Sequence, residues 1–109
     1  MALFPVSTLG YIIDCAFTIA FDPQFDELLL ASKEATYAGI KAAGVDARLG
    51  EIGGIIEEVI SSHEVTINGT THPIRPVRNL SGHTVGKGTI HAGKSVPLVA
   101  GRDMVGVSL

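Results

Sequence analysis

Residues 10–44 read GYIIDCAFTIAFDPQFDELLLASKEATYAGIKAAG, and they contain the change from strand to helix that decides the fold. The stretch 10–21 is rich in branched and aromatic residues with apolar side chains on both faces, which predicts a strand covered on two sides. Asp22 and Pro23 then favour a helix start, as an N-cap and a first helical residue. Apolar residues recur at helical spacing from there, and Gly44 is the expected C-cap.

A second helix is expected to begin near Asp46, because apolar residues at helical spacing follow it. This helix contains three glycines, each costing up to about 1 kcal/mol relative to alanine. Either another element approaches the helix closely or the glycines are there by chance; they are Gly50, Gly53 and Gly54. Asn68-Gly69 between two β-rich runs predicts a hairpin with a type I′ turn. The fold class is therefore α/β (α+β): antiparallel strands, two packed helices and a β-hairpin.

The composition excludes several kinds of partner. The chain has 109 residues and a net charge of −3, and its eight basic residues are scattered. We therefore expect no binding to nucleic acid or to an anionic membrane surface. No apolar run is long enough to span a bilayer, the start lacks a basic leader, and a single cysteine favours a reducing compartment. These features together predict a cytoplasmic protein.

A few polar residues are candidates for chemistry. Asp14 lies within an apolar strand. It is either an aspartate that is hydrogen-bonded at the edge of a sheet or a metal ligand whose charge a cation compensates. His83, between Gly82 and Gly86, is either structural or a side chain aimed at a crowded site. His91 could act as an acid or hydrogen-bond donor towards a substrate, if a strand-turn-strand brings it near His83. The remaining histidines, His63 and His72, flank the hairpin and are expected to be solvated.

Three ordered blocks carry a resemblance to a known family. They are GYIIDCAFT at 10–18, NLSGHTVG at 79–86 and IHAGKSVP at 90–97. These blocks, with the intervening stretches 39–49 and 74–80, resemble the type 2 methionine aminopeptidases, which are M24 metallopeptidases. The resemblance covers residues 10–99, so we expect 1–9 and 100–109 to be divergent ends.

The resemblance implies a pita-bread fold and removal of the initiator methionine from nascent polypeptides. It also implies a pair of divalent metal ions (Co, Mn, Zn or Fe), with Asp14 as a bridging carboxylate and His83 as the imidazole ligand. Ile90 and His91 match positions near the substrate pocket, and His91 would contact the methionyl substrate as a catalytic residue.

The chain departs from this pattern where other ligands are expected. Leu3 stands where the family has an aspartate, and no glutamates follow the last block in the family's pattern. We therefore expect a central fragment of the enzyme that is inactive alone, binds metal weakly or not at all, and self-associates through exposed strand edges. Two alternatives stay open. One is a non-catalytic pita-bread module that binds a ribosome, RNA or a protein partner, and the other is an unrelated domain with chance motifs.

Overall fold

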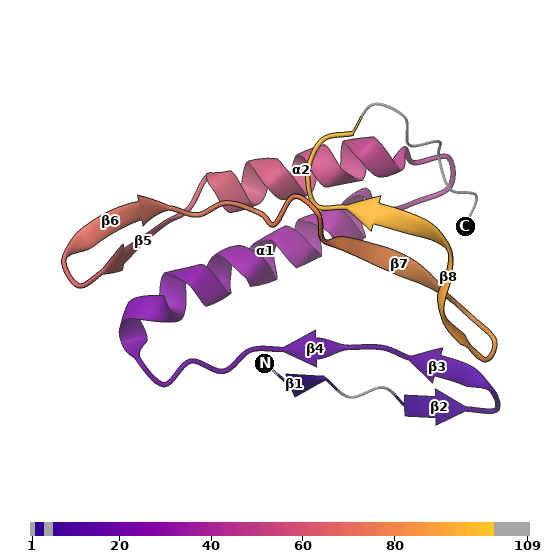
Figure 1. The fold of residues 1–109 in the computed structure, drawn as a ribbon. Coiled ribbons are helices and arrows are strands. Elements are labelled where there is room, and N and C mark those ends of the chain that lie inside the picture. Colours follow the sequence, from indigo (N-terminus) through magenta and orange to yellow (C-terminus); the bar gives the residue numbers. More distant parts are fainter. Residues whose placement is uncertain (1, 4–5, 102–109) are drawn as a thin grey trace.

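The computed structural model describes residues 2–3 and 6–101, with side chains described from Leu9 onward. Short antiparallel strands come first, a helical layer follows, and a hairpin and a longer strand pair complete the chain (Figure 1). The early strands are β1 Ala2–Leu3, β2 Val6–Thr8, β3 Tyr11–Ile13 and β4 Ala16–Phe17. The helices are η1 Pro23–Phe25, α1 Asp26–Ala42 and α2 Leu49–Ser61. The later strands are β5 Glu64–Ile67, β6 Thr70–Pro73, β7 Ser81–Gly86 and β8 Thr89–Pro97.

The first helix begins where its sequence predicts. The Asp22 carboxylate accepts a hydrogen bond from the Gln24 backbone N–H at 3.0 Å, and Pro23 opens the 3₁₀ turn that leads into α1. The prediction that Gly44 is the C-cap is wrong, because Ala43 caps α1 in an extended conformation, and the left-handed backbone comes later, at Asp46 with φ 62°. Aspartate tolerates this conformation better than most residues, so it can reverse the chain before α2.

The two α-helices lie side by side and form most of the apolar core (Figure 1). Ala35 of α1 packs with the buried α2 residues Leu49, Ile52 and Ile56. A second cluster joins α1 to the hairpin through Ala31, Val65 and Ile74. Burial of apolar side chains at helical spacing therefore accounts for both helices, as the sequence predicts.

Close backbone approach explains two of the α2 glycines. A Cβ atom at Gly53 would overlap the Val99 carbonyl oxygen, and one at Gly50 would overlap the Gly101 carbonyl oxygen. The segment that follows β8 thus lies directly against α2. Gly54 is different, since an added Cβ would meet the Ala100 Cβ at an ordinary 3.6 Å.

Every strand pair among the described residues is antiparallel, which confirms the predicted fold class. The pairs are β1–β4, β2–β3, β5–β6 and β7–β8. Asn68 and Gly69 have φ angles of 49° and 82°, which is the pattern of the predicted type I′ hairpin. No helix within residues 2–3 and 6–101 is long and apolar enough to cross a membrane.

The prediction of one strand over 10–21, covered on two sides, is wrong in extent and in burial. The strand is interrupted between β3 and β4, at Asp14 and Cys15. Its apolar side chains are largely exposed, with Ile19 61% and Phe21 98% accessible. The early strands form two-stranded sheets in the described part of the chain, and β3 also has an isolated bridge from Tyr11 to Lys87, so most apolar side chains of this stretch stay accessible to solvent.

Candidate functional site

Backbone contacts between β3 and β7 place Asp14 beside His83. Tyr11 forms an isolated antiparallel bridge with Lys87, and the Gly88 N–H donates to the Gly10 carbonyl at 2.7 Å. In an antiparallel pair, moving forward along one strand corresponds to moving backward along the other. The bridge therefore aligns Asp14 with the middle of β7, next to His83.

The side chains of Asp14 and His83 meet in a partly enclosed position. His83 Nε2 lies 3.0 Å from Asp14 Oδ2, and the two side chains are 22% and 19% exposed. Asp14 is thus paired with an imidazole, in keeping with the high cost of burying a lone carboxylate. Both interpretations of Asp14, a hydrogen-bonded side chain at a sheet edge and a metal ligand, are compatible with this contact.

The other nitrogen of the His83 ring determines what Nε2 can do. His83 Nδ1 lies 3.1 Å from the Thr84 carbonyl oxygen, which can only accept a hydrogen bond, so Nδ1 carries the proton. A neutral ring then presents a lone pair at Nε2, facing an ionised carboxylate that is also an acceptor. The contact is favourable if the ring is doubly protonated or if a cation lies between the two atoms.

An irregularity in the β7–β8 ladder brings His91 to this pair. His83 is opposite Ser95, but Thr84 is opposite Ala92, so β8 carries extra residues at this point. The Thr84 hydroxyl fills the bulge, accepting from the Lys94 N–H at 3.2 Å. The shift moves His91 closer to His83 along the ladder, and the two ring centroids are 4.3 Å apart in an edge-on arrangement. The expected strand-turn-strand route to His83 is therefore confirmed.

Two further positions from the sequence lie near this group by their place in the strands. Ile90 is half-buried on β8, directly before His91. Leu3 pairs with Ala16 on β4, close in sequence to Asp14. The side chain of leucine has no metal-binding atom, so position 3 cannot supply a carboxylate ligand.

The donor atoms of Asp14 and His83 fit a divalent metal ion. Two ligand atoms bound at about 2.1 Å and at right angles are about 3.0 Å apart. The observed separation of Oδ2 and Nε2 is 3.0 Å. The Thr84 carbonyl on Nδ1 is the kind of contact that orients a metal-binding histidine. No group of three or more histidine, cysteine, aspartate or glutamate side chains is arranged around a metal position within residues 2–3 and 6–101.

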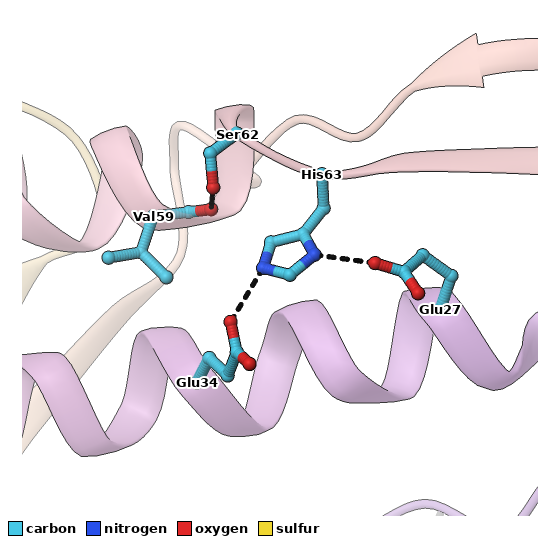
Figure 2. Close-up of polar contacts among 5 residues, drawn as sticks. All are labelled: Glu27, Glu34, Val59, Ser62 and His63. Atoms are coloured by element: carbon cyan, nitrogen blue, oxygen red, sulfur yellow. Dashed lines mark hydrogen bonds and ion pairs between the residues drawn. The ribbon is translucent and has the colours of Figure 1, made fainter.

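The prediction that His63 is solvated is wrong, whereas His72 is exposed as expected. His63 lies between α2 and β5, its side chain is 12% exposed, and each ring nitrogen contacts a carboxylate of α1 (Figure 2). These carboxylates belong to Glu27 and Glu34. Their spacing of two helical turns places both on one face of α1, which is the one sequence signal that could have indicated the contact.

The profile of metallopeptidase family M24 matches residues 4–105. The chain belongs to metallopeptidase family M24. Three curated proteins are similar to the chain over most of its length. The chain is 59% identical over 100 residues to methionine aminopeptidase 2-2 of Chaetomium globosum, and 59% identical over 100 residues to methionine aminopeptidase 2 of Kluyveromyces lactis. It is 58% identical over 95 residues to methionine aminopeptidase 2 of Dictyostelium discoideum.

The matched regions cover most of this M24 chain but a small part of the relatives. The match to the Chaetomium protein covers 92% of this chain and 23% of that protein. The match to the Kluyveromyces protein covers 92% of this chain and 24% of that protein. The match to the Dictyostelium protein covers 87% of this chain and 22% of that protein. The chain thus spans about a quarter of the length of these curated relatives. The similarity to type 2 methionine aminopeptidases inferred from the sequence blocks is confirmed.

Proposed function

We propose that this chain forms the central part of a metal-dependent methionine aminopeptidase, which removes the N-terminal methionine from nascent proteins. The observation that carries the proposal is the convergence of Asp14, His83 and His91, with His83 Nε2 3.0 Å from Asp14 Oδ2. The relatives are named methionine aminopeptidases, and these names support a polypeptide with an N-terminal methionine as the substrate.

Asp14 and His83 would hold metal in this proposal. The carboxylate has two oxygen atoms and can bridge a pair of ions, while the imidazole can offer one lone pair from Nε2. When bound, a pair of divalent ions would supply an activated water and stabilise the charge that develops on the scissile carbonyl. A carboxylate-rich site with one histidine suits Co, Mn, Zn or Fe.

His91 would contact the substrate. Its ring is exposed and lies edge-on to His83, so it faces the same region without being enclosed. From there it can donate a hydrogen bond to the methionyl group or hold a proton for the reaction. Ile90, half-buried beside it, would contribute apolar surface to the methionine pocket.

The 109 residues by themselves are expected to be inactive. Asp14 and His83 are too few protein ligands to hold two metal ions, and Leu3 cannot replace a third. The chain alone would therefore bind metal weakly or not at all. Its exposed apolar side chains, including Phe21 at 98% and Leu9 at 88%, favour self-association. We place the protein in the cytoplasm, where nascent chains emerge, with no nucleic-acid or membrane partner.

Methionine release from a Met-Ala-Ser peptide with Mn²⁺ or Co²⁺ tests the proposal. The 109-residue chain should give no turnover, whereas an active longer polypeptide that contains it should lose at least about a hundredfold in rate with Asp14→Asn, since the metal contributes several kcal/mol. His72→Gln, an exposed imidazole on β6, is the matched control and should retain the rate. Full activity of the Asp14→Asn polypeptide would refute the ligand assignment. Turnover by the 109 residues that Asp14→Asn abolishes would refute their inactivity.

A further inference from the structure

His63 links the connection between α2 and β5 to α1, which lies much earlier in the sequence. It follows α2 and precedes β5, and its ring reaches α1 (Figure 2). Nδ1 lies 2.7 Å from Glu27 Oε1, and Nε2 lies 2.8 Å from Glu34 Oε2. The imidazole is 12% exposed, while the two carboxylates are about half exposed at 47% and 50%.

Both contacts can be hydrogen bonds at once only in one protonation state. Ionised carboxylates accept hydrogen bonds and cannot donate, and a neutral imidazole has a single N–H. A neutral His63 ring can therefore satisfy Glu27 or Glu34 but not both. The imidazolium ion donates to both and also carries the charge that attracts them.

The two carboxylates around the ring both raise the pKa of His63. The hydrogen bond to Glu27 raises the pKa of His63 most, partial burial lowers it, and the hydrogen bond to Glu34 and the two negative charges raise it further, so that the pKa lies above 6.5. Glu64, the next residue and the first of β5, is also charged but is not among the groups that shift the pKa of His63. On α2 the Ser62 hydroxyl donates to the Val59 carbonyl, and on the β6 side the Ile74 N–H donates to the His63 carbonyl. Among the described residues, Glu27 and Glu34 are the charged groups that act on this ring.

The remaining attachments of the hairpin to the helical layer do not titrate near neutral pH. At its tip, the Asn68 N–H donates to Gln24 Oε1 at 3.1 Å. Along its length, Val65 and Ile74 pack on Ala31 of α1. His63 is thus the one attachment described here whose charge can change between pH 6 and 8.

We propose that His63, Glu27 and Glu34 form a protonation-dependent clamp that holds the β5–β6 hairpin against α1. This role is separate from the proposed metal site, because Asp14 lies between β3 and β4, His83 on β7 and His91 on β8. The two carboxylates contact opposite ring nitrogens, so the cluster does not converge on a single cation. The folded state binds the proton more tightly than the unfolded chain. With both carboxylates ionised, the stability that the clamp adds is fully present below the unfolded-state pKa of His63, near 6.5, and is lost as the pH rises through its folded-state pKa.

The test is an NMR titration of the 109-residue chain, or of a longer polypeptide that contains it. The ring resonances of His63 give its midpoint, and amide hydrogen exchange gives the protection of β5 and β6 after correction for the intrinsic rate at each pH. We expect a midpoint above 6.5 and a fall in hairpin protection across it. If hairpin exchange proceeds through clamp opening, the ratio of the protection plateaus equals the factor by which the fold raises the proton affinity of His63.

Matched variants distinguish a protonation-dependent clamp from a histidine whose structural role does not depend on its charge. Glu27→Gln and Glu34→Gln keep the side-chain size at exposed positions, and each should lower the His63 midpoint and shrink the pH-dependent fall. Glu51→Gln removes the same charge from an exposed position in the first turn of α2 and should change neither quantity. A midpoint at or below 6.5, hairpin protection that is constant across the midpoint, or an equal shift from Glu51→Gln would each overturn the proposal.

Discussion

The helical layer and the strands that carry Asp14 are stabilised in different ways. The apolar side chains of the buried core belong to α1, α2, β5 and the residue after β6, whereas none of residues 9–21 is buried. Asp14 is held in place by the bridge of Tyr11 to Lys87 and by the Gly88 to Gly10 hydrogen bond. The comparison indicates that burial determines where the helices lie, while a few directional contacts determine where the candidate ligands lie.

Truncation of one large side chain in each region should give the largest contrast. Ile56→Ala removes a buried side chain and should reduce the free energy of unfolding by about 2–5 kcal/mol. Phe21→Ala removes a ring that is 98% exposed and should change it by no more than about 0.5 kcal/mol. Urea unfolding measures both. Equal losses would mean that the early strands also depend on burial.

Two neighbouring glycines of α2 allow a crowded position and an open position to be compared within one helix. Gly53→Ala forces a Cβ into the Val99 carbonyl and should destabilise the chain by about 1–3 kcal/mol. Gly54→Ala has room beside Ala100 and should stabilise it by up to about 1 kcal/mol through helix propensity. Thermal unfolding of the pair checks the opposite signs. A stabilising Gly53→Ala would contradict the close approach of the segment after β8.

The start of the helical layer depends on a local cap. Asp22→Ala removes the acceptor for the Gln24 N–H and should cost about 1 kcal/mol, while Asp22→Ser keeps an acceptor and should cost a few tenths. Because Gln24 also holds the hairpin tip at Asn68, hydrogen exchange at Asn68 should increase in the alanine variant. Identical unfolding energies for alanine and serine would exclude a capping role.

The smallest effect is expected at the side-chain contact between Lys87 and Tyr11, next to the backbone bridge that positions the candidate site. The Lys87 ammonium lies 5.6 Å from the centre of the Tyr11 ring. Lys87→Met keeps much of the apolar stem and removes the charge, so it should cost about 0.5–1 kcal/mol. The same loss should occur in Lys87→Met and in Tyr11→Leu, with no further loss in the double variant. Fully additive losses in this double-mutant cycle would show that the two side chains do not interact.

The sequence predicts elements that have local causes. The Asp22-Pro23 start, the spacing of apolar residues in α1 and α2, and the Asn68-Gly69 turn each act within a few residues, and the structure confirms them. The predicted C-cap at Gly44 is off by one residue, because Ala43 ends α1 with an extended backbone and the left-handed turn falls at Asp46 instead.

The site depends on contacts between distant segments, which local patterns do not encode. The sequence blocks indicate Asp14 and His83 as candidate ligands, but the contact between them requires the bridge from Tyr11 to Lys87. His63 was missed because its carboxylate partners are 36 and 29 positions away in the chain. The packing of α2 against α1 brings His63 next to these two carboxylates.

The bulge opposite His83 makes chain length at that point more critical than side-chain identity. A shift of one residue in an antiparallel ladder turns the following side chains to the other face of the sheet. Deletion of Gly93 or Lys94 would therefore carry His91 away from His83 even though both histidines were retained. Among natural variants of this segment, substitutions at these two positions should be tolerated far more often than insertions or deletions.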